Sequence, residues 1–448
     1  MEPFLQIFVG LCFIGLIIVL FFEKVDYILY SVALIIIASL VTAIFIPETR
    51  DLTFFMNAVK WEVIFFFIAI FTIVEILKQS GFFDEIGFRV IKHYKTKPRK
   101  LFYVICIVTT LLASVIAGIS IVAIFIPIII VICREIKINP TPFLLGISVC
   151  VNLAATLTPV GSAQNILIAN EFTLDFNWFL VHIIPYFLLT FVITLITLDR
   201  FVLSKFLNNQ RKESEDEKNQ ELSKENPSTD KKNRPILKNL ILLIIFIASL
   251  IIISESYLVS LVFSIIFLIF NPDKKSDVSH HKYSLIRYLQ RVDYKLIYFF
   301  ICLFIFIALM EINGTLLLLE NLIENLAFEN ELLLSIIILI STSLLSGFLD
   351  NTPVTIIFIP IIEILIASPN FYAFPLFVAF ILGVNLGGNF LPQGSPADLM
   401  ILELGRINNV KGLTYKKMVK IGGSYAFIHI LLGIGYITLI VLLFPNFN

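Results

Sequence analysis

Long runs of apolar residues, separated by short polar segments, extend over almost the whole chain. The clearest runs are residues 3–22, 25–46, 59–77, 178–198, 236–253 and 421–443. A helix needs roughly 20 apolar residues to cross the hydrocarbon core of a bilayer, and each of these runs is about that long. The pattern therefore predicts an all-α polytopic membrane protein.

An internal repeat relates the two halves of the chain. A shift of 233 residues aligns residues 59–83 with 292–316, with seven of 25 positions identical. The same shift places VNLAATLTPVGS (151–162) on VNLGGNFLPQGS (384–395). Because polar and helix-breaking residues coincide as well as apolar ones, we interpret the match as a duplicated structural unit.

The charges of equivalent loops predict that the two repeats have inverted topology. The loop at 78–100 carries seven Lys or Arg residues, whereas its repeat partner, 311–331, carries five Glu residues and no Lys or Arg. Loops rich in Lys and Arg stay in the cytoplasm, so these equivalent loops are expected on opposite sides of the membrane. Both chain termini are then expected outside.

A polar segment separates the two repeats. Residues 204–235 are rich in Lys, Glu, Asp, Asn and Ser, and their low hydrophobicity predicts a disordered cytoplasmic linker. The chain therefore divides into a first transmembrane repeat (1–203), this linker, and a second, inverted transmembrane repeat (236–448). The first apolar run lacks the basic start and the cleavage site of a signal peptide, so we interpret it as a permanent helix.

Composition narrows the class of protein further. Hydrophobic residues make up 58% of the chain and charged residues only 15%, whereas a soluble domain carries about 25% charged residues. The five cysteines contain no CxxC pair, and the five histidines lack metal-ligand spacing. No cofactor is expected, and no metal beyond a transported or coupling Na⁺.

Each repeat is expected to contain a re-entrant hairpin, two short helices that enter and leave the membrane on one side. In the second repeat the arms are 333–348 and 354–367, and the tip is DNTP (350–353), in which Thr suits an N-cap and Pro the first helical position. The partner hairpin spans roughly 101–133, with the tip AGIS (117–120).

The helix after each hairpin is predicted to be discontinuous. Residues 143–154 have a helical pattern, but ATLTPVGS (155–162) does not. In the second repeat, 375–386 is followed by GGNFLPQGSP (387–396) before a helical pattern resumes. Irregular backbone at membrane depth occurs only where it lines a cavity or is buried in protein, and paired breaks of this kind point to a transport site.

The broken helices indicate the chemistry of the ligands. Resumed half-helices present free N–H groups and partial positive charge, which favour an anion. Unwound carbonyls with Asn and Thr oxygens suit a small hard cation such as Na⁺. The residues expected to bind substrate or ion are Ser120, Asn152, Thr156, Thr158, Gly161, Ser162, Asn165, Asp350, Asn351, Thr352, Pro353, Asn385, Gly387, Gly388, Asn389, Gln393, Gly394, Ser395 and Asp398.

Two carboxylates fall in the broken segments, where an ionisable side chain is costly and usually functional. Asp350 lies at the hairpin tip and could also cap the second arm, and Asp398 could complete a capping box with Ser395. We hypothesise that the two aspartates carry or compensate a coupling proton or sodium ion. Glu171 and Glu363 are expected near helix ends, at the membrane interface.

At these residues the chain resembles the ion transporter superfamily, which includes divalent-anion:sodium symporters, citrate–metal symporters, arsenite efflux permeases and D-type sodium/proton antiporters. The resemblance covers nearly the whole chain and is most specific at LDNTPVTIIFIP (349–360), GVNLGGNFLPQGSPADLM (383–400) and NLAATLTPVGSAQNIL (152–167). It implies that hairpin tips and unwound loops bind cation and substrate. It also implies an elevator-type movement of that unit against a scaffold.

The first repeat departs from the family's pattern. Asn351 and Thr352 match the Asn-Thr pair of the tip motif, but the first tip lacks that pair and leaves Ser120 as its only polar side chain. The resemblance therefore implies that the first cation site is weakened, with the chemistry mainly in the second repeat. Asp398 stands where a neutral Asn is common, whereas Asn165 keeps that type.

These observations favour a secondary active transporter that moves a small anion or oxyanion, coupled to Na⁺ or H⁺. A Na⁺/H⁺ antiporter and an arsenite-type efflux permease are the alternatives. The broken segments carry no Lys or Arg, which favours a monovalent or neutral solute. The expected partners are membrane lipid and a small inorganic or organic ion, without nucleic acid, and a homodimer is compatible with the sequence.

Other classes of protein fit less well. An intramembrane aspartyl protease would show a GxGD arrangement, which the SGFLDN context of Asp350 lacks. A channel is disfavoured because broken, inverted repeats suit alternating access rather than a fixed pore. The sequence has no Walker A pattern, so ATP-driven work by this chain alone is not expected, and neither is enzymatic activity.

Overall fold

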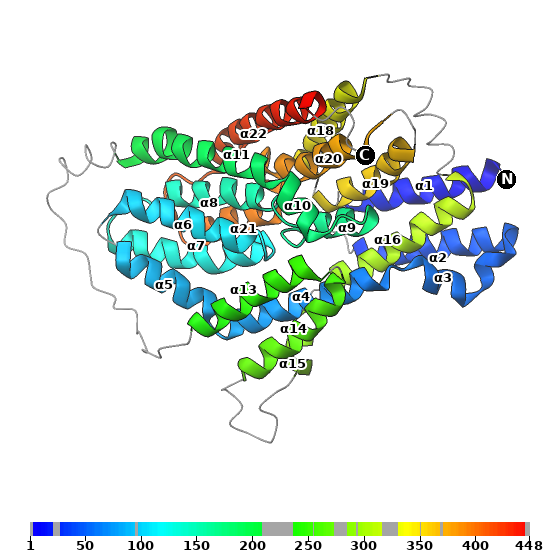
Figure 1. Ribbon diagram of the computed structural model, residues 1–448, viewed down its shortest axis with the longest axis horizontal. Helices are drawn as coiled ribbons and strands as arrows, with labels where there is room; N and C mark the ends of the chain where they lie inside the picture. The colour runs from blue at the N-terminus through cyan, green and yellow to red at the C-terminus, as the bar shows by residue number, and fades with distance from the viewer. Residues whose placement is uncertain are drawn as a thin grey trace.

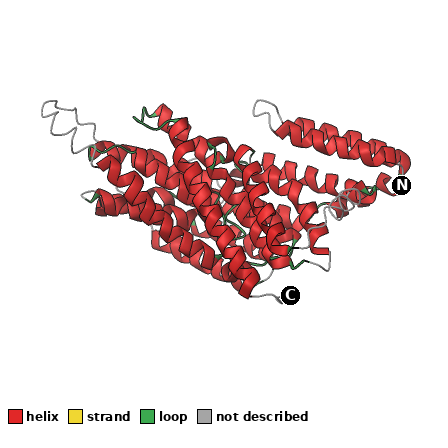
Figure 2. Cartoon of the chain, turned by 90° about the horizontal axis from the view of Figure 1, so that it is seen from above, coloured by secondary structure: helices red, strands yellow, loops and turns green. Residues whose placement is uncertain are grey.

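The described part of the chain is entirely helical. The computed structural model describes residues 3–20, 27–94, 97–207, 236–253, 255–272, 285–292, 294–315, 330–349, 351–367 and 371–443. Every regular element in these ranges is an α-, 3₁₀- or π-helix, with no strand among them (Figure 2). The prediction of an all-α fold is therefore confirmed.

Several helices are long enough to span a membrane. The five described helices that combine sufficient length with high hydropathy are Ile28–Phe45, Gly118–Glu135, Ile184–Leu207, Glu331–Phe348 and Tyr415–Leu443. Others are apolar but shorter. The helix α8, Thr141–Ala154, has 14 residues, which reach only about 21 Å, whereas the hydrocarbon core is about 30 Å thick. Such helices cross the membrane only together with a second segment.

The helices form two bundles that lie side by side (Figure 1). We call one the flanking bundle. It contains α1 (Pro3–Leu20), α2 (Tyr27–Phe45), η1 (Pro47–Arg50), α3 (Leu52–Ala58), α4 (Trp61–Gln79), α13 (Ile236–Ile252), α14 (Ser256–Phe270), α15 (Leu285–Leu289) and α16 (Tyr294–Ile312).

We call the other the site bundle, because it holds both predicted breaks. It contains α6 (Pro98–Ala113), α7 (Gly118–Glu135), α8 (Thr141–Ala154), α9 (Ala163–Glu171), α10 (Phe176–His182), α11 (Ile184–Thr197), η2 (Leu198–Leu203), α18 (Glu331–Phe348), α19 (Asn351–Ala367), α20 (Ala373–Leu386), η3 (Gly387–Asn389), η4 (Pro392–Gly394), α21 (Pro396–Ile407) and α22 (Tyr415–Leu443). The amphipathic helix α5 (Phe82–Tyr94) packs against helices of both bundles and joins α4 to α6.

The two halves of the chain exchange packing partners in both bundles. In the flanking bundle, α4 of the first half packs against α14 of the second, and α16 packs against α1 and α2. In the site bundle, α21 packs against α7, and α19 packs against α9. Each half therefore buries part of its apolar faces on the other half, although pairs such as α18 with α20 and α6 with α8 pack within one half.

Helix boundaries follow the offset of the sequence repeat. The helices α7 and α19 begin at residues 118 and 351, and α9 and α21 begin at residues 163 and 396, so both pairs are 233 residues apart. Both breaks lie where the sequence predicts them, after Ala154 and after Leu386. The inverted orientation of the two repeats stays a prediction from the charge pattern.

The hairpin tips differ in detail from the prediction. In the first hairpin the connection is 114–117, because Ser120 N already donates to Ala117 O at 2.9 Å and starts the helix α7. In the second hairpin, α19 begins at Asn351, so Thr352 lies inside the first turn and is not the N-cap. Asp350 lies outside the described residues. The helix that contains η2 continues to Leu207, inside the predicted linker, and 208–235 lie outside the described residues.

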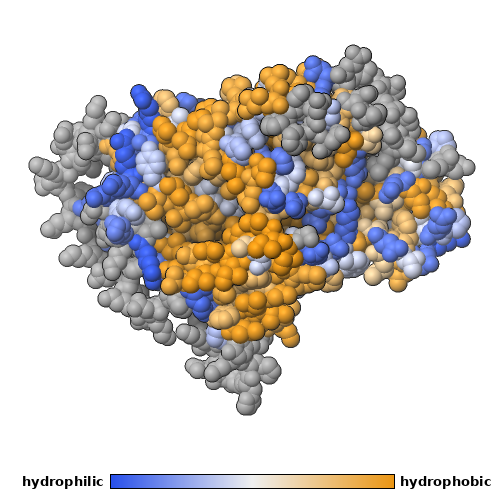
Figure 3. All heavy atoms as spheres, viewed as in Figure 1, coloured by the Kyte–Doolittle hydropathy of each residue, from blue (hydrophilic) through white to orange (hydrophobic). Residues whose placement is uncertain are grey.

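Hydrophobic side chains dominate the surface of the molecule. On the face seen in Figure 3, a broad apolar band covers the centre, and hydrophilic residues gather at the end where α5 and α6 lie. A second hydrophilic patch on this face separates the apolar band from the end that holds α2 and α3. Apolar bands of this extent are buried in lipid in membrane proteins.

Glycines allow the second break to approach the hairpin closely. A Cβ atom on Gly387 would lie 2.3 Å from Ser343 O of α18, and one on Gly394 would lie 2.7 Å from Ser346 O. Both obstacles are backbone atoms, which cannot move away as the end of a flexible side chain can. The contact between the unwound loop and α18 therefore depends on glycine at these positions.

Gly387→Ala should destabilise the protein, because the added methyl group forces the loop away from α18. Overpacking of this kind costs about 1–3 kcal/mol, which thermal unfolding of the detergent-solubilised protein would register as a lower midpoint. Gly435→Ala is the matched control, since a Cβ there meets nothing within 4 Å. An equal effect of both substitutions would contradict the argument from close packing.

Candidate functional site

The two breaks meet in the site bundle through side chains at equivalent positions of the two repeats. Asn152 Nδ2, in the last turns of α8, donates to Asp398 Oδ2 of α21 at 2.9 Å. Asn385 Nδ2, at the end of α20, donates to Asn165 Oδ1 of α9 at 2.7 Å. In both cases the asparagine before one break bonds to a residue after the other break.

Two serines complete these cross-repeat contacts. Ser395 Oγ donates to Asn152 Oδ1 at 2.8 Å, and Ser162 Oγ donates to Asn385 Oδ1 at 3.1 Å. Each amide carbonyl is thus held by the serine that precedes the resumed helix of the other repeat. Three residues at equivalent positions meet on each side, namely Asn152, Asp398 and Ser395 on one and Asn385, Asn165 and Ser162 on the other, which is the pattern of a pseudo-two-fold site.

Asp398 is buried among neutral donors. Its side chain is 3% exposed, and Ser148 Oγ donates to Oδ1 at 2.5 Å, whereas Asn152 Nδ2 donates to Oδ2. The capping-box interpretation is wrong, because Ser395 makes no side-chain cap on α21 and bonds to Asn152 instead. A buried carboxylate without a nearby basic side chain is costly, and a bound cation or proton lowers that cost.

Asn165, the equivalent of Asp398 in the first repeat, uses its amide differently. Its Nδ2 donates to Ala155 O at 2.7 Å and to Thr158 O at 2.9 Å, which are carbonyls of its own break. Ser162 Oγ accepts from Asn165 N at 3.3 Å and caps α9. A carboxylate at this position could not donate to those carbonyls, so Asp398 cannot bond the second break in the way that Asn165 bonds the first.

The first hairpin tip is tied to its break by backbone and hydroxyl groups. Thr158 Oγ1 donates to Ser114 O, in the connection between α6 and α7. A Cβ on Gly161 would lie 3.1 Å from Ser114 O and 3.2 Å from Ala155 O. These carbonyl oxygens could ligate a cation, but protein donors already bond to each of them.

The second hairpin tip is tied to its break through Asn351. With the amide oriented to satisfy its neighbours, Asn351 Nδ2 donates to Val384 O at 3.1 Å and to Gly394 O at 3.0 Å, and also to Ser346 Oγ. The hydrogen-bond network decides this orientation. Asn351 Oδ1 then accepts from Gln164 Nε2 of α9 at 3.0 Å. Gln164 also donates to Asn385 Oδ1 at 3.0 Å and so links the second tip to both breaks.

Asn389 supplies a donor that the protein does not use. Its side chain is 2% exposed, and Asn389 Oδ1 accepts from Asn152 Nδ2 at 2.9 Å. Its Nδ2 has no hydrogen-bond partner among the described residues. An orphaned buried N–H group is rare, because its desolvation is not compensated. Asn389 therefore has an unused buried amide donor next to the Asn152–Asp398 pair.

Several residues predicted for the site do not join this network. Ser120 lies half-buried in the first turn of α7, Thr156 Oγ1, in the first break, donates to Leu153 O of α8, and Gln393 Oε1 accepts from Tyr415 OH. Thr352 and Pro353 are buried in the first turn of α19. Gly388 packs close to Gly394 O and the Asn351 side chain, and Asp350 lies outside the described residues.

Four polar residues of the site were not predicted, namely Ser114, Ser148, Gln164 and Ser346. Ser148 precedes Asn152 by one helical turn, so the two lie on one face of α8. This four-residue spacing is the sequence signal that places Ser148 beside Asn152 in the site. Within the described ranges, no three His, Cys, Asp or Glu side chains come together as a metal site. The groups that could hold a cation are carbonyl, hydroxyl and amide oxygens with one carboxylate.

Helix breaks stabilised by a buried polar network, inside an apolar helical chain, define a multi-pass integral membrane protein of the transporter class. The sequence matches the citrate transporter family at residues 17–278 and 257–447. The chain therefore belongs to that family. The resemblance to the ion transporter superfamily is thereby confirmed.

Relatives match over most of the chain. A 46 kDa membrane protein of Mycobacterium leprae is 25% identical over 357 residues, 78% of this chain and 80% of the relative. An uncharacterized transporter of Mycobacterium tuberculosis is 25% identical over 388 residues, 85% of this chain and 86% of the relative. The solved structure of the YdaH transporter of Alcanivorax borkumensis matches with a TM-score of 0.60 at 11% identity and 87% coverage of both chains. This last likeness concerns the fold.

Asn152→Leu should destabilise the protein, because it leaves one oxygen of buried Asp398 without a donor. A hydrogen bond to a charged group contributes about 1.5–3 kcal/mol, so the unfolding midpoint should fall clearly. Asp398→Leu removes the carboxylate that needs the donor. The double variant Asn152→Leu with Asp398→Leu should therefore lose less stability than the sum of the losses in the two single variants. Additive losses in this double-mutant cycle would show that the two side chains are not coupled.

Proposed function

We propose that the chain is a secondary transporter of a small carboxylate or oxyanion, driven by co-transport of a cation. The observation that supports this most directly is the meeting of the two breaks in one buried network with a carboxylate, Asp398, and a free amide donor on Asn389. The donor suits an anion, and the carboxylate suits a cation or a proton. The membership in the citrate transporter family favours a citrate-type carboxylate as substrate.

The charge of the site limits how an anion is held. The predicted tips and breaks contain no Lys or Arg at 114–128, 151–168, 346–362 or 384–401. A multivalent anion would therefore rely on the N-termini of α9 and α21, on amide donors, and on cations bound with it. In this proposal a carboxylate of citrate type enters the site together with a neutralising cation.

Asp398 is the residue proposed to couple cation and substrate. In the first repeat the amide of Asn165 satisfies the carbonyls of its break, but a carboxylate cannot donate to the equivalent carbonyls. Na⁺ bound at Asp398 would neutralise the charge of the buried carboxylate. A proton bound there would do the same and would also give the side chain a hydrogen-bond donor. The proposal therefore places the coupling chemistry in the second repeat.

The proposed movement is a displacement of the site bundle against the flanking bundle. The site bundle contains both hairpins and both breaks, and its internal hydrogen bonds link the two repeats. Among the described residues, the site bundle meets the flanking bundle where α9 packs on α4 and α10 packs on α13. The helix α5 contacts both bundles. In this proposal α5 is the arm between the bundles, and both chain termini lie outside.

A Na⁺/H⁺ antiporter is the second candidate, and the burial of Asp398 favours it, since one carboxylate can bind Na⁺ and H⁺ alternately. Addition of Na⁺ to everted vesicles that hold a proton gradient distinguishes the two. Dissipation of the gradient without any anion supports the antiporter, whereas dependence on an added anion supports symport.

Cation-dependent anion binding is the first expected outcome. Purified protein should be stabilised against heat by citrate or a dicarboxylate only with Na⁺, Mg²⁺ or protons supplied, by about 2.7 kcal/mol at a hundredfold excess over Kd. Asn389→Leu should weaken binding roughly tenfold or more, as expected for loss of one bond to a charged group. Asn170→Leu is the matched control, because Asn170 bonds only within α9. Stabilisation by arsenite, phosphate or sulfate instead would contradict a carboxylate substrate.

Asp398→Asn should uncouple substrate exchange from the cation gradient, because an amide supplies its own donors and binds a cation poorly. We expect concentrative uptake into proteoliposomes to be lost and substrate exchange at equal concentrations to persist. Asp175→Asn is the control, since Asp175 is an exposed cap of α10 that Asn can replace. Concentrative uptake with unchanged cation dependence in Asp398→Asn would exclude this residue from coupling.

A further inference from the structure

An ion pair bridges the two bundles, away from the candidate site. Lys60 directly precedes α4 of the flanking bundle, and Glu171 ends α9 of the site bundle. Lys60 Nζ lies 2.5 Å from Glu171 Oε1. The Glu171 side chain is 14% exposed and that of Lys60 is 41% exposed, so the contact is partly shielded from solvent.

A second carboxyl group of the site bundle reinforces this contact. The side chain of Glu363, on α19, is half-buried and lies near the side chain of Glu171. Two carboxyl groups can share a hydrogen bond only when one of them is protonated. Because Lys60 already pairs with Glu171, a proton shared by the two carboxyl groups would reside on Glu363. Glu363 is thus a positioning residue for Glu171.

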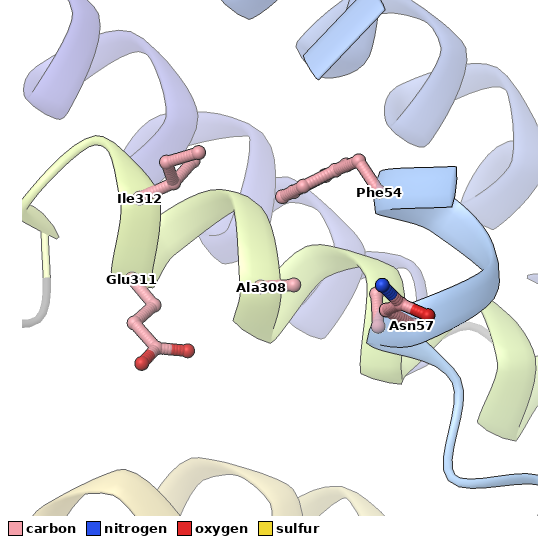
Figure 4. A pocket seen from close by; sticks show the side chains of 6 residues that line it. Phe54, Asn57, Ala308, Glu311 and Ile312 are labelled. Atoms are coloured by element: carbon pink, nitrogen blue, oxygen red, sulfur yellow. The ribbon is translucent and has the colours of Figure 1, made fainter. Parts of the chain in front are cut away.

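The charged groups that face Glu363 come from three elements. They are Glu171 of α9, Lys60 before α4, and Glu311 of α16. Glu311 is exposed and points away from α3, and it lines a cavity of about 380 Å³ with Phe54 and Asn57 (Figure 4). Lys60 therefore attracts the acidic side chains of the site bundle, whereas Glu311, on the same bundle as Lys60, repels them.

We propose that Lys60, Glu171 and Glu363 form an electrostatic latch that holds the site bundle against the flanking bundle in the arrangement of this structure. The proposal rests on the proposed function in one respect, namely that the site bundle moves. Displacement of α9 along α4 separates Lys60 from Glu171. The latch then has to open in every transport cycle, so its strength sets the ratio of latched to displaced molecules.

The distance between the bundles tests the latch. Spin labels on Leu52 of α3 and Val181 of α10 report it, because both side chains are exposed, at 71% and 57%, whereas the five native cysteines are buried. Lys60→Gln and Glu171→Gln should each raise the displaced population roughly 1.5- to 5-fold, as expected for a partly exposed ion pair. The exchanged pair Lys60→Glu with Glu171→Lys should restore much of the original distribution.

Variants of Glu363 separate its proposed role from a general packing role. Glu363→Gln keeps an N–H donor for Glu171 and should leave the distribution unchanged, whereas Glu363→Leu should behave like Glu171→Gln. Arg291→Gln is the matched control. It breaks the Arg291–Glu75 pair, which has an N–O distance of 3.1 Å and equally shielded carboxylates, but lies within the flanking bundle. This control should not change the distance between the bundles.

The outcomes distinguish the latch from the movement on which it rests. Unchanged distances in Lys60→Gln and Glu171→Gln, with a shift of the wild-type distribution on addition of citrate and Na⁺ or Mg²⁺, would overturn the latch and leave the movement intact. One fixed distance in all variants, with and without these ions, would overturn both the latch and the elevator mechanism. A change in Arg291→Gln equal to that in Lys60→Gln would also overturn the latch.

Discussion

Hydrogen bonds between the two repeats join the buried polar side chains beside the helix breaks, and the remaining arrangement depends on them. A break at membrane depth leaves amide and carbonyl groups without helical partners, and lipid offers none. Asn152 and Asn385 join the two breaks, because each bonds to side chains that follow the break of the other repeat. The carbonyls of each break are bonded within their own half, by Asn165 and by Asn351, whereas the side chains beside the breaks depend on the other half.

The same network explains how a nearly symmetric fold holds an asymmetric site. At equivalent positions, Asn165 donates to carbonyls of its own break, whereas Asp398 accepts from Ser148 and Asn152. One change from amide to carboxylate reverses the direction of hydrogen bonding and adds a buried negative charge. An amide of the same repeat therefore bonds the carbonyls of the first break, whereas the equivalent position in the second repeat carries a buried carboxylate. Asymmetry of this kind costs little in backbone geometry, because both halves keep their helix boundaries.

Most of the fold could be predicted from the sequence because its signals are local. Apolar runs mark the helices, and Pro and Gly in apolar surroundings mark the breaks, so the predicted segments 143–154 and 375–386 differ by two residues from α8 and α20 at their starts. The first hairpin tip was placed three residues late, because Gly118 signals a turn as readily as a helix start. Ser148 and Gln164 were missed for another reason. They lie in regular helix, and their partners are 250 and 221 residues away.

The exchange of packing partners between the halves has a consequence for biogenesis. The helix α4 is synthesised long before α14, against which it packs, and α7 and α9 wait for α21 and α19. Chains are made from the N-terminus onward, so α1 can pack on α2 and α6 on α8 before the second half exists. The faces of α4, α7 and α9 that pack on the second half are covered only when that half arrives. Final assembly is thus a post-insertion event, closer to the association of two subunits than to the sequential growth of one.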